Sequence, residues 1–553
     1  MPTINASKKD IEKLVGKTFS KEELEETLMY VKGELDAMNR DALVIDVKET
    51  NRPDLWSAEG IAREIRTRTG KDKGIKEYKV SKAKISCTIE KTVEKTRPFI
   101  CCAVIRNVKI TEEFLLQMIQ LQEKIGMTFG RKRKETGIGL YDLNKMTPPV
   151  FYRGYKDKEI EFIPLEYKVP MRPSEILLEH PKGKEFGNLL KDAEYFPIVI
   201  DSKKVVASMP PIINSETTGK VTEKTKDIFI EVTGFNWETV NTALKVMCMA
   251  FADRGSTIEA VKINFPESKV YPKKSIETPF FGTKKIMLET EYVNRISGLN
   301  LKEKEIVSLL ERSGMNVKTK GKKLEVEYPD YRNDILHPID IVEDAIIAYG
   351  YNNIEPKKVE MSVVGEELKE RIYLDKVRDV CVGMGLQEVL TFNLTSIEKQ
   401  TQKMLLKEEL VEIANPVSTN WQAMRKRITP ELIDYLAKNR HAEYPQRIFE
   451  IGTCLDIDSK SENGVRQTYN LCIAMCDSKA NFTVIKSALD AVCRNLGLNY
   501  SMKETNLAFL EEGKRGEITI GKFKGFLGEV NSKTLDNFGL DKKIVVLEIE
   551  LVD

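Results

Sequence analysis

The chain has 553 residues, of which 41% are hydrophobic and 31% are charged. This length exceeds what one hydrophobic core supports and predicts roughly three or four domains, while no apolar run approaches the roughly 20 residues that span a bilayer, which excludes a membrane protein. Lys and Arg number 87 against 85 Asp and Glu, so a nucleic acid would have to meet local basic patches rather than a globally basic surface.

The start of the chain and its cysteine content both indicate the cellular compartment of the protein. Residues 1–10 lack the long apolar core of a signal peptide and carry an acidic residue too early for a typical transit peptide. The nine cysteines include no Cys-x-x-Cys pair, and with only three histidines the composition argues against zinc ribbons and fingers. We therefore expect reduced cysteines, mostly in cores, and a cytoplasmic protein.

The first segment predicts a small α/β domain. We expect a helix near residues 20–32, a strand near 43–47, and a second helix that Ser57 caps. A break rich in glycine and lysine follows at 70–74. We place the end of the first domain there.

The second segment alternates short strands with helices, which predicts a mixed α/β domain. An apolar strand is expected at 100–105 and an amphipathic helix at 112–125. The run Gly-Arg-Lys-Arg-Lys at 130–134 could hold a phosphate backbone electrostatically, although such a run is more often a solvated loop.

Two stretches of this segment carry possible chemistry. Residues 208–215 contain paired prolines, which favour an extended or turned loop. Residues 227–234 form an alternating strand, so its odd-numbered residues, Glu231 and Thr233 among them, point the same way. This polar file could line a pocket. The alternative is an edge strand with one solvated face, which the residues alone favour.

The third segment predicts a compact helical domain with a small wing-like strand region. Helices are expected near 285–296 and 302–312, and a strand near 323–328. A last helix should begin at Pro338 and end before Gly350.

This last helix carries a cluster of acids. Asp340, Glu343 and Asp344 share one of its faces, and Asp334 lies just upstream. Two interpretations stay open: a magnesium site, since this ion takes oxygen ligands, or acids stabilised by the helix macrodipole without a metal. Because the acidic face continues into Ile347, we expect partial burial, and clustered buried carboxylates need a counter-ion.

The last segment predicts a sheet with flanking helices. A helix through Val377 and Cys381 should turn at 383–385, with strands at 388–393, up to 449–452 and at 544–551. The glycine pair in the turn is weak support for phosphate binding.

Taken together, these segments contain a series of motifs in a fixed order. They are Asn51-Arg52-Pro53-Asp54-Leu55, Glu59-Gly60-Ile61-Ala62-Arg63, Met209-Pro210-Pro211-Ile212-Ile213-Asn214-Ser215, Tyr331-Arg332 with Asp334-Ile335, the acidic helix to Gly350-Tyr351, Asn415-Pro416-Val417-Ser418 with Met424-Arg425, and Phe449-Glu450-Ile451-Gly452. In this order the chain resembles, over essentially its whole length, the beta subunits of phenylalanyl-tRNA synthetase of the archaeal/eukaryotic type.

The resemblance implies an α+β multidomain fold with four domains. These are an N-terminal α/β domain at 1–75, a mixed α/β tRNA-editing domain at 80–270, a small helical winged magnesium-binding domain at 274–353, and a class II synthetase-like antiparallel-sheet domain at 362–553 that lacks active-site motifs.

The resemblance also implies site residues. The editing pocket, which would hydrolyse tyrosine wrongly attached to the phenylalanine tRNA, would use Ser208, Asn214, Glu231 and Thr233. Glu231 departs from the aspartate expected in many relatives. The magnesium ligands would be Asp334, Asp340, Glu343 and Asp344.

The last domain departs from an active class II synthetase. The glycine pair at 383 and 385 is followed by Glu388 rather than the arginine that would hold a phosphate, and Arg515-Gly516-Glu517 fits an Arg-x-Glu pattern only by chance, in an expected turn. The sites for ATP and phenylalanine would therefore lie on a separate alpha subunit, in a complex of two alpha and two beta subunits that binds the phenylalanine tRNA. Because the sequence ends soon after its last expected strand, we expect it to lack the extra anticodon-binding domain of the bacterial form.

Two alternatives remain beside this ligase subunit. One is a non-catalytic tRNA-binding scaffold whose editing pocket is degenerate, as Glu231 permits. The other is a magnesium-dependent phosphohydrolase, which is poorly supported because His337 is the only nearby candidate nucleophile, and a lone histidine before a proline is more often structural.

Overall fold

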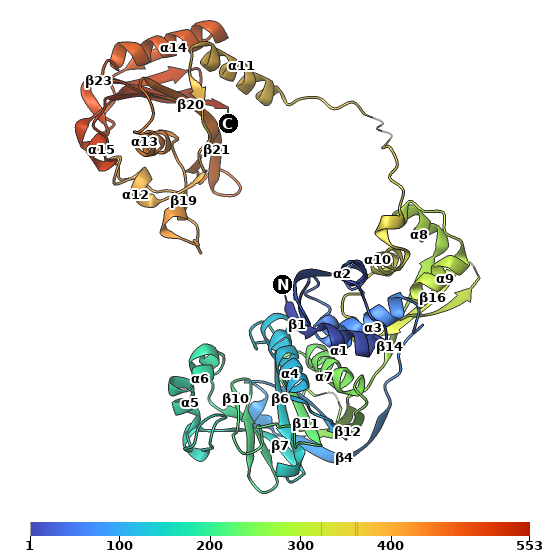
Figure 1. Cartoon of the computed structure of the whole chain (residues 1–553). Helices are drawn as coiled ribbons and strands as arrows, with labels where there is room; N and C mark the ends of the chain where they lie inside the picture. Colours follow the sequence, from blue (N-terminus) through green and yellow to red (C-terminus); the bar gives the residue numbers. More distant parts are fainter. Residues whose placement is uncertain (1, 272, 322, 360, 362, 553) are drawn as a thin grey trace. The chain divides into compact units, whose positions relative to one another are not determined.

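The computed structural model describes residues 2–271, 273–321, 323–359, 361 and 363–552. The chain divides into two compact units, Met1–Lys357 and Lys358–Asp553 (Figure 1). All nine cysteines are buried and reduced, as predicted. No helix in the described stretches is long and apolar enough to cross a membrane.

The first unit begins with a small sheet of order β1-β3-β2, covered by helices. Its elements are β1 (Thr3–Ser7), α1 (Lys8–Val15), α2 (Lys21–Met29), β2 (Gly33–Asn39), β3 (Ala42–Val47) and α3 (Ala58–Arg68). The predicted helix cap is confirmed, because the hydroxyl of Ser57 accepts a hydrogen bond from the Gly60 amide at 3.1 Å.

A large sheet follows, with the strand order β10-β9-β8-β7-β4-β12-β5-β11-β6 and β13 paired to β12. Its strands are β4 (Val80–Ile89), β5 (Phe99–Arg106), β6 (Thr136–Asp142), β7 (Val150–Tyr155), β8 (Phe196–Asp201), β9 (Val206–Met209), β10 (Ile213–Asn214), β11 (Ile228–Gly234), β12 (Thr257–Asn264) and β13 (Ser275–Thr278). Helices α4 (Glu112–Lys124) and α7 (Trp237–Ala252) share a hydrophobic core with one face of the sheet, and α5 (Pro173–Glu179) and α6 (Pro181–Phe186) lie near β10 (Figure 1).

Strand β11 has a neighbouring strand on each side in this sheet, so the prediction of an edge strand with a solvated face is wrong. It pairs with β5 on one side and with β6 on the other. All of its residues are buried, including Glu231 and Thr233. The polar file therefore faces the protein interior, where a polar group requires a partner.

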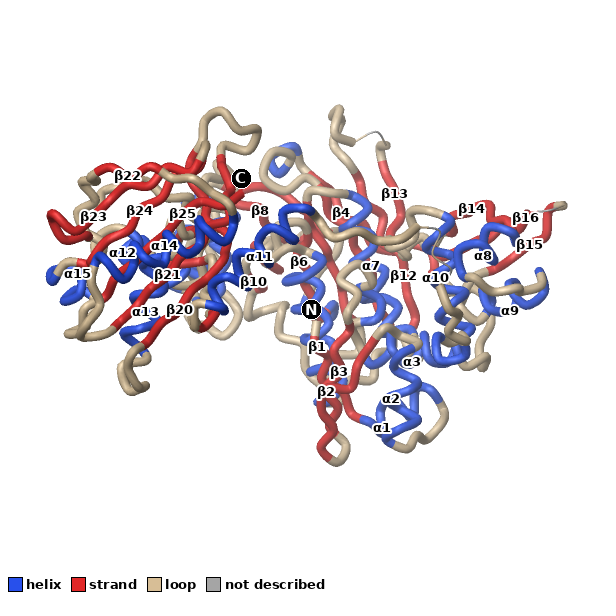
Figure 2. The backbone as a smooth tube through the Cα atoms, turned by 90° about the horizontal axis from the view of Figure 1, so that it is seen from above, coloured by secondary structure: helices blue, strands red, loops and turns tan. Residues whose placement is uncertain are grey.

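The third part of this unit packs helices on a sheet of order β14-β16-β15 (Figure 2). Its elements are β14 (Thr283–Glu289), α8 (Thr290–Ser297), α9 (Glu303–Glu311), β15 (Asn316–Lys320), β16 (Lys323–Pro329) and α10 (Pro338–Tyr349). The helix expected at 285–296 is wrong in its first half, because residues 285–289 pair with β16 instead and bury Leu288 on the covered face. The other predicted elements are confirmed.

The second unit is built on a sheet of order β17-β20-β21-β25-β24-β23-β22. Its strands are β17 (Gln387–Glu388), β20 (Gln446–Ile457), β21 (Val465–Cys476), β22 (Ser501–Lys503), β23 (Leu510–Ile520), β24 (Phe523–Val530) and β25 (Ile544–Val552); its helices include α11 (Lys369–Gly383), α13 (Thr429–Lys438) and α14 (Phe482–Leu496). The expected strand at 388–393 is mostly absent, since 389–393 take no strand conformation. Arg515-Gly516-Glu517 lies within β23 rather than in a turn.

Candidate functional site

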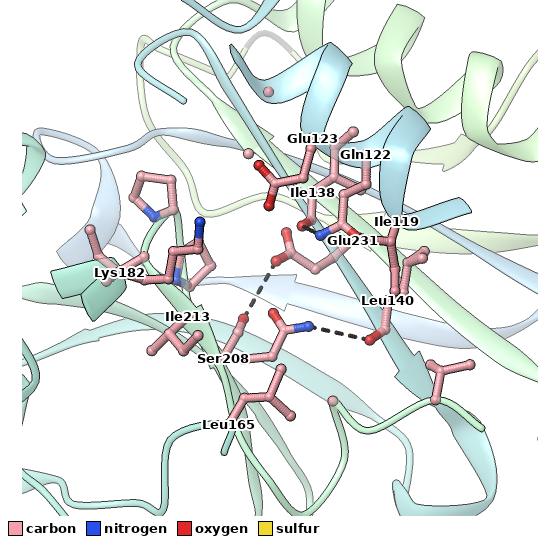
Figure 3. Close-up of a pocket in the computed structure, with 18 of the residues that line it drawn as sticks. Ile119, Gln122, Glu123, Ile138, Leu140, Leu165, Lys182, Ser208, Ile213 and Glu231 are labelled. Atoms are coloured by element: carbon pink, nitrogen blue, oxygen red, sulfur yellow. Dashed lines mark hydrogen bonds between the residues drawn. The ribbon is translucent and has the colours of Figure 1, made fainter. Parts of the chain in front are cut away.

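A cavity of about 470 Å³ lies in the first unit beside α4 and β6 (Figure 3). Much of its wall is apolar and includes Ile119, Ile138, Leu140, Leu165 and Ile213. A mostly apolar cavity with a few polar groups is typical of a site that binds a small molecule or one end of a larger ligand. The polar side chains on the wall include Gln122, Glu123, Lys182, Ser208, Asn214 and Glu231.

The cavity lies where the two ends of the large sheet meet. Strand β6 stands at one end of the strand order, and β9 and β10 stand at the other. Yet the Asn214 side-chain amide in β10 donates to the carbonyl of Leu140 in β6 at 3.4 Å. Arg133, in the turn before β6, donates to the carbonyls of Pro211 and Ile212 at 3.2 and 3.0 Å. The predicted proline turn between β9 and β10 thus closes the sheet on itself.

Glu231 places a buried carboxyl at the cavity, with only 2% of the residue exposed. Its Oε1 lies 2.8 Å from the Tyr141 hydroxyl and 3.4 Å from the Ser208 hydroxyl, and Figure 3 shows the Ser208 contact. Its Oε2 is also buried and accepts no hydrogen bond from the described residues. Burial raises the pKa of Glu231 to about 7, although the hydrogen bond from Tyr141 and the charge of Arg97 oppose the rise. This carboxyl therefore changes charge near neutral pH.

The structure brings three of the four predicted pocket residues together. Ser208, Asn214 and Glu231 line the cavity. Thr233 is fully buried and does not line it. Instead, its hydroxyl accepts a hydrogen bond from Arg97 Nε at 2.9 Å, and its carbonyl accepts another from the same guanidinium at 2.6 Å. Thr233 thus anchors Arg97 behind the cavity.

The residues that sequence reasoning missed lie on β6. Tyr141 contacts both Ser208 and Glu231, and Gly139 lies directly opposite Glu231. A side chain at Gly137 would collide with Pro211, at 2.8 Å from the new Cβ to the proline Cβ. The pattern Gly-Ile-Gly-Leu-Tyr at 137–141 was the available signal, because two glycines at spacing two leave one face of a strand bare.

The basic run at 130–134 is divided between two environments. Arg131 and Lys132 are exposed, as expected of a solvated loop. Arg133 instead forms an ion pair with Glu123 at 2.9 Å, and its guanidinium lies 4.3 Å from the centre of the Phe186 ring. Arg133 thus links the turn before β6 to α4 and α6 at the cavity wall.

The acidic helix α10 has the predicted bounds, but arginines surround its buried acid. Arg332 donates to Oδ2 of Asp344 at 2.5 Å, and Arg68 of α3 donates to Oδ1. Arg332 also holds Asp334, at 2.8 Å from Nε and 2.6 Å from Nη2. Burial alone would raise the pKa of Asp344, but the charges of Arg332 and Arg68 outweigh it and hold that pKa well below its ordinary value.

The other two acids have separate roles. Asp340 accepts hydrogen bonds from the amides of Leu336 and His337, both at 2.7 Å, and so caps the helix. Glu343 is half-exposed and pairs with Lys32 at 3.1 Å. Within the described ranges no group of three or more Asp, Glu, His or Cys side chains is arranged to hold a metal. As they lie in this chain, the four acids therefore do not fit a shared magnesium site, and guanidinium groups supply the counter-ion that burial requires.

Comparison with known families matches nearly all of the chain beyond its first domain. The family model described as the B3/4 domain matches residues 96–252, which include the cavity. The tRNA synthetase B5 domain matches 286–351, and the phenylalanyl tRNA synthetase beta chain CLM domain matches 354–551.

Full-length relatives extend the match. The chain is 42% identical over 557 residues to the phenylalanine–tRNA ligase beta subunit of Thermococcus sibiricus and 43% identical over 557 residues to that of Pyrococcus horikoshii. These alignments cover 100% of this chain and 98% and 99% of the relatives. A crystal structure of an N-terminal fragment of the Pyrococcus horikoshii phenylalanyl-tRNA synthetase beta subunit is 44% identical, with a TM-score of 0.61, and covers 63% of this chain and 100% of the fragment.

Glu231→Gln should stabilise the protein at alkaline pH. The folded-state pKa of about 7 lies above the ordinary 4.5, so stability is lost as pH rises through this window, where the unfolded chain has already released the proton. Glutamine has no proton to lose. We expect the free energy of unfolding of the variant to exceed that of the parent by about 1–3 kcal/mol near pH 8 and by much less near pH 5. Urea denaturation at both pH values measures this, and a pH-independent difference would contradict it.

Asp344→Asn should destabilise the first unit strongly, because it leaves Arg68 and Arg332 buried without their shared carboxylate. We expect a loss of about 3–5 kcal/mol. Glu343→Gln is the matched control on the same helix and should cost less than about 1 kcal/mol, since its ion pair is half-exposed. EDTA should leave the unfolding temperature of the parent unchanged in calorimetry. A lower temperature in EDTA would show that a metal does stabilise this helix.

Proposed function

The chain belongs to the family of phenylalanine–tRNA ligase beta subunits and is a component of an aminoacyl-tRNA ligase, and we propose that its cavity hydrolyses tRNA that carries tyrosine in place of phenylalanine. One observation carries this proposal: a buried carboxyl, that of Glu231, keeps one oxygen without a partner in a mostly apolar cavity.

The difference between the two amino acids is one hydroxyl, and the cavity offers a group suited to it. The apolar part of the wall would take either aromatic ring, whereas the carboxyl of Glu231 would accept the hydrogen bond of the phenol alone. A site built to hydrogen-bond a substrate hydroxyl can discriminate against the analogue without it by about 10⁴–10⁵, far more than an apolar pocket achieves. Phenylalanine would leave the buried carboxyl without a partner, which costs free energy.

The reaction itself is the hydrolysis of an ester. Water adds to the carbonyl carbon of the aminoacyl group, the bond to the ribose oxygen breaks, and that oxygen leaves with a proton. Asn214 and Ser208 stand at the cavity wall near Glu231, where they would orient the bound aminoacyl end of the tRNA. Asn214 is hydrogen-bonded to Leu140 and Ser208 to Tyr141, and both partners lie on β6. These contacts fix the positions of Asn214 and Ser208 relative to Glu231.

We also propose that aminoacylation itself takes place on a partner alpha subunit, which would bind ATP and phenylalanine. Three basic side chains that line a cavity of the second unit are paired with acids. Arg427 pairs with Glu408 at 2.6 Å, Lys426 with Asp456 at 2.8 Å, and Arg466 with Glu550 at 3.0 Å. Such paired charges give little attraction to a triphosphate.

Removing the polar groups of the cavity should impair deacylation of tyrosyl-tRNA by the complex with the alpha subunit. We expect Glu231→Ala and Asn214→Ala to lower kcat/KM for this reaction by about 10- to 100-fold, as the loss of a buried hydrogen bond predicts. Glu343→Gln, outside the cavity, is the control and should leave the rate unchanged. Equal rates in all four proteins would favour the alternative of a tRNA-binding scaffold with a degenerate pocket.

The chain alone should catalyse no phenylalanine-dependent exchange between ATP and pyrophosphate. Exchange should appear when the alpha subunit is added, because that subunit would hold the sites for ATP and phenylalanine. The measurement compares the isolated chain, the isolated alpha subunit and the mixture. Exchange by the isolated chain would contradict the proposal that aminoacylation takes place on the alpha subunit.

A further inference from the structure

Tyr141 lies behind the cavity, fully buried, and does not line it. In the pairing of β6 with β11, Tyr141 stands opposite Phe229, two residues before Glu231. Residues two apart on a strand share a face, so Tyr141 and Glu231 are diagonal neighbours on one side of the sheet. The Tyr141 hydroxyl is 2.8 Å from Oε1 of Glu231 and 2.7 Å from the hydroxyl of Ser208.

Gly139 makes this contact possible. It lies between Tyr141 and Glu231, and a Cβ there would stand 2.0 Å from the Tyr141 hydroxyl oxygen and 2.7 Å from Oε1 of Glu231. Any other residue at 139 would therefore displace the tyrosine hydroxyl from the carboxyl. Because Gly139 has no side chain, the phenol of Tyr141 can extend along the strand to the carboxyl of Glu231.

The contact divides the two carboxyl oxygens of Glu231 between two environments. Oε1 receives Tyr141 and Ser208, while Oε2 has no partner among the described residues. We propose that Tyr141 is a positioning residue, which holds Oε1 of Glu231 and so fixes the carboxyl at the cavity wall, where it would accept the phenolic hydroxyl of the aminoacyl group. This rests on the proposed editing function.

The hydrogen bond also acts on the charge of Glu231. A phenol has one proton, and an ionised carboxylate is a stronger acceptor for it than a serine hydroxyl. The contact thus favours the charged form and opposes the rise in pKa that burial causes. The other charged side chains on the cavity wall are those of Glu123, Arg133, Glu166, Lys182, Glu216 and Lys220. The buried titratable groups that interact electrostatically with Glu231 include Arg97, Cys102 and Tyr152. Burial raises the pKa values of the cysteine and the tyrosine well above their ordinary ranges, so both stay neutral, and Arg97 is the cation among these groups.

The test compares Tyr141→Phe with Tyr271→Phe in the complex with the alpha subunit. Each variant removes one buried tyrosine hydroxyl, since Tyr271 donates to the Pro98 carbonyl at 2.8 Å outside the cavity. In Tyr141→Phe we expect kcat/KM for tyrosyl-tRNA to fall about five- to tenfold near pH 7. The midpoint of its pH profile should move upward, so that raising the pH restores most of the rate. Tyr271→Phe should keep the parent's rate and midpoint.

A second readout does not depend on editing. The infrared carbonyl band of the protonated carboxyl, identified as the band that Glu231→Gln removes, reports the titration of Glu231 directly in the full chain. Its midpoint should rise in Tyr141→Phe and stay unchanged in Tyr271→Phe. If the parent complex does not deacylate tyrosyl-tRNA, the proposed function fails while the infrared titration still decides on the contact. An unchanged infrared midpoint in Tyr141→Phe, or a lower rate with an unmoved pH profile, would overturn the role of Tyr141.

Discussion

The large sheet of the first unit brings its two ends together, and the cavity depends on that meeting. Hydrogen bonds across the junction join β6 to β9 and β10: Tyr141 contacts Ser208, and Asn214 donates to Leu140. Arg133 adds two bonds to the proline turn. Without these contacts, Ser208 and Asn214 would belong to one end of the strand order and Glu231 to the other. The closed arrangement makes one site from residues that the strand order separates.

Two buried carboxyl groups of this unit, Asp344 and Glu231, have opposite pKa shifts. Asp344 receives two guanidinium groups, which hold its pKa well below the ordinary value and keep it charged. Among the described residues, no guanidinium donates a hydrogen bond to Glu231 and one of its oxygens has no partner, so burial raises its pKa to about 7. The first carboxylate is satisfied and serves stability. The second combines burial with an oxygen that lacks a partner, a combination more typical of functional sites than of structural ion pairs.

Further ion pairs tie the N-terminal domain to its neighbours within the first unit. Arg63 of α3 pairs with Asp253 at 2.6 Å, and Arg254 pairs with Asp10 at 2.6 Å and also contacts Glu59. Arg68 of the same helix reaches Asp344 of α10. Because removing one partner of a buried pair leaves an uncompensated charge, these contacts define how the domains of this unit dock. The acidic helix α10 thus forms part of the contact between the N-terminal domain and the helical domain of this unit.

Local patterns in the sequence determined much of this protein. The helix cap at Ser57, the bounds of α10, the proline turn and the strand at 227–234 all follow from spacing and residue type, because capping, proline geometry and side-chain alternation act over a few residues. What lies beside an element does not follow from such patterns. Residues 285–289 became a strand because β16 pairs with them, and β11 is not an edge strand because β5 and β6 flank it. The expected burial of the acidic face, with its need for a counter-ion, is confirmed for Asp344, whereas Glu343 on the same helix is exposed. Only the tertiary structure decided that Arg68, 276 positions away, joins Arg332 as this counter-ion, and that Tyr141 completes the site of Glu231, because both contacts join residues far apart in the sequence and leave no periodic trace in it.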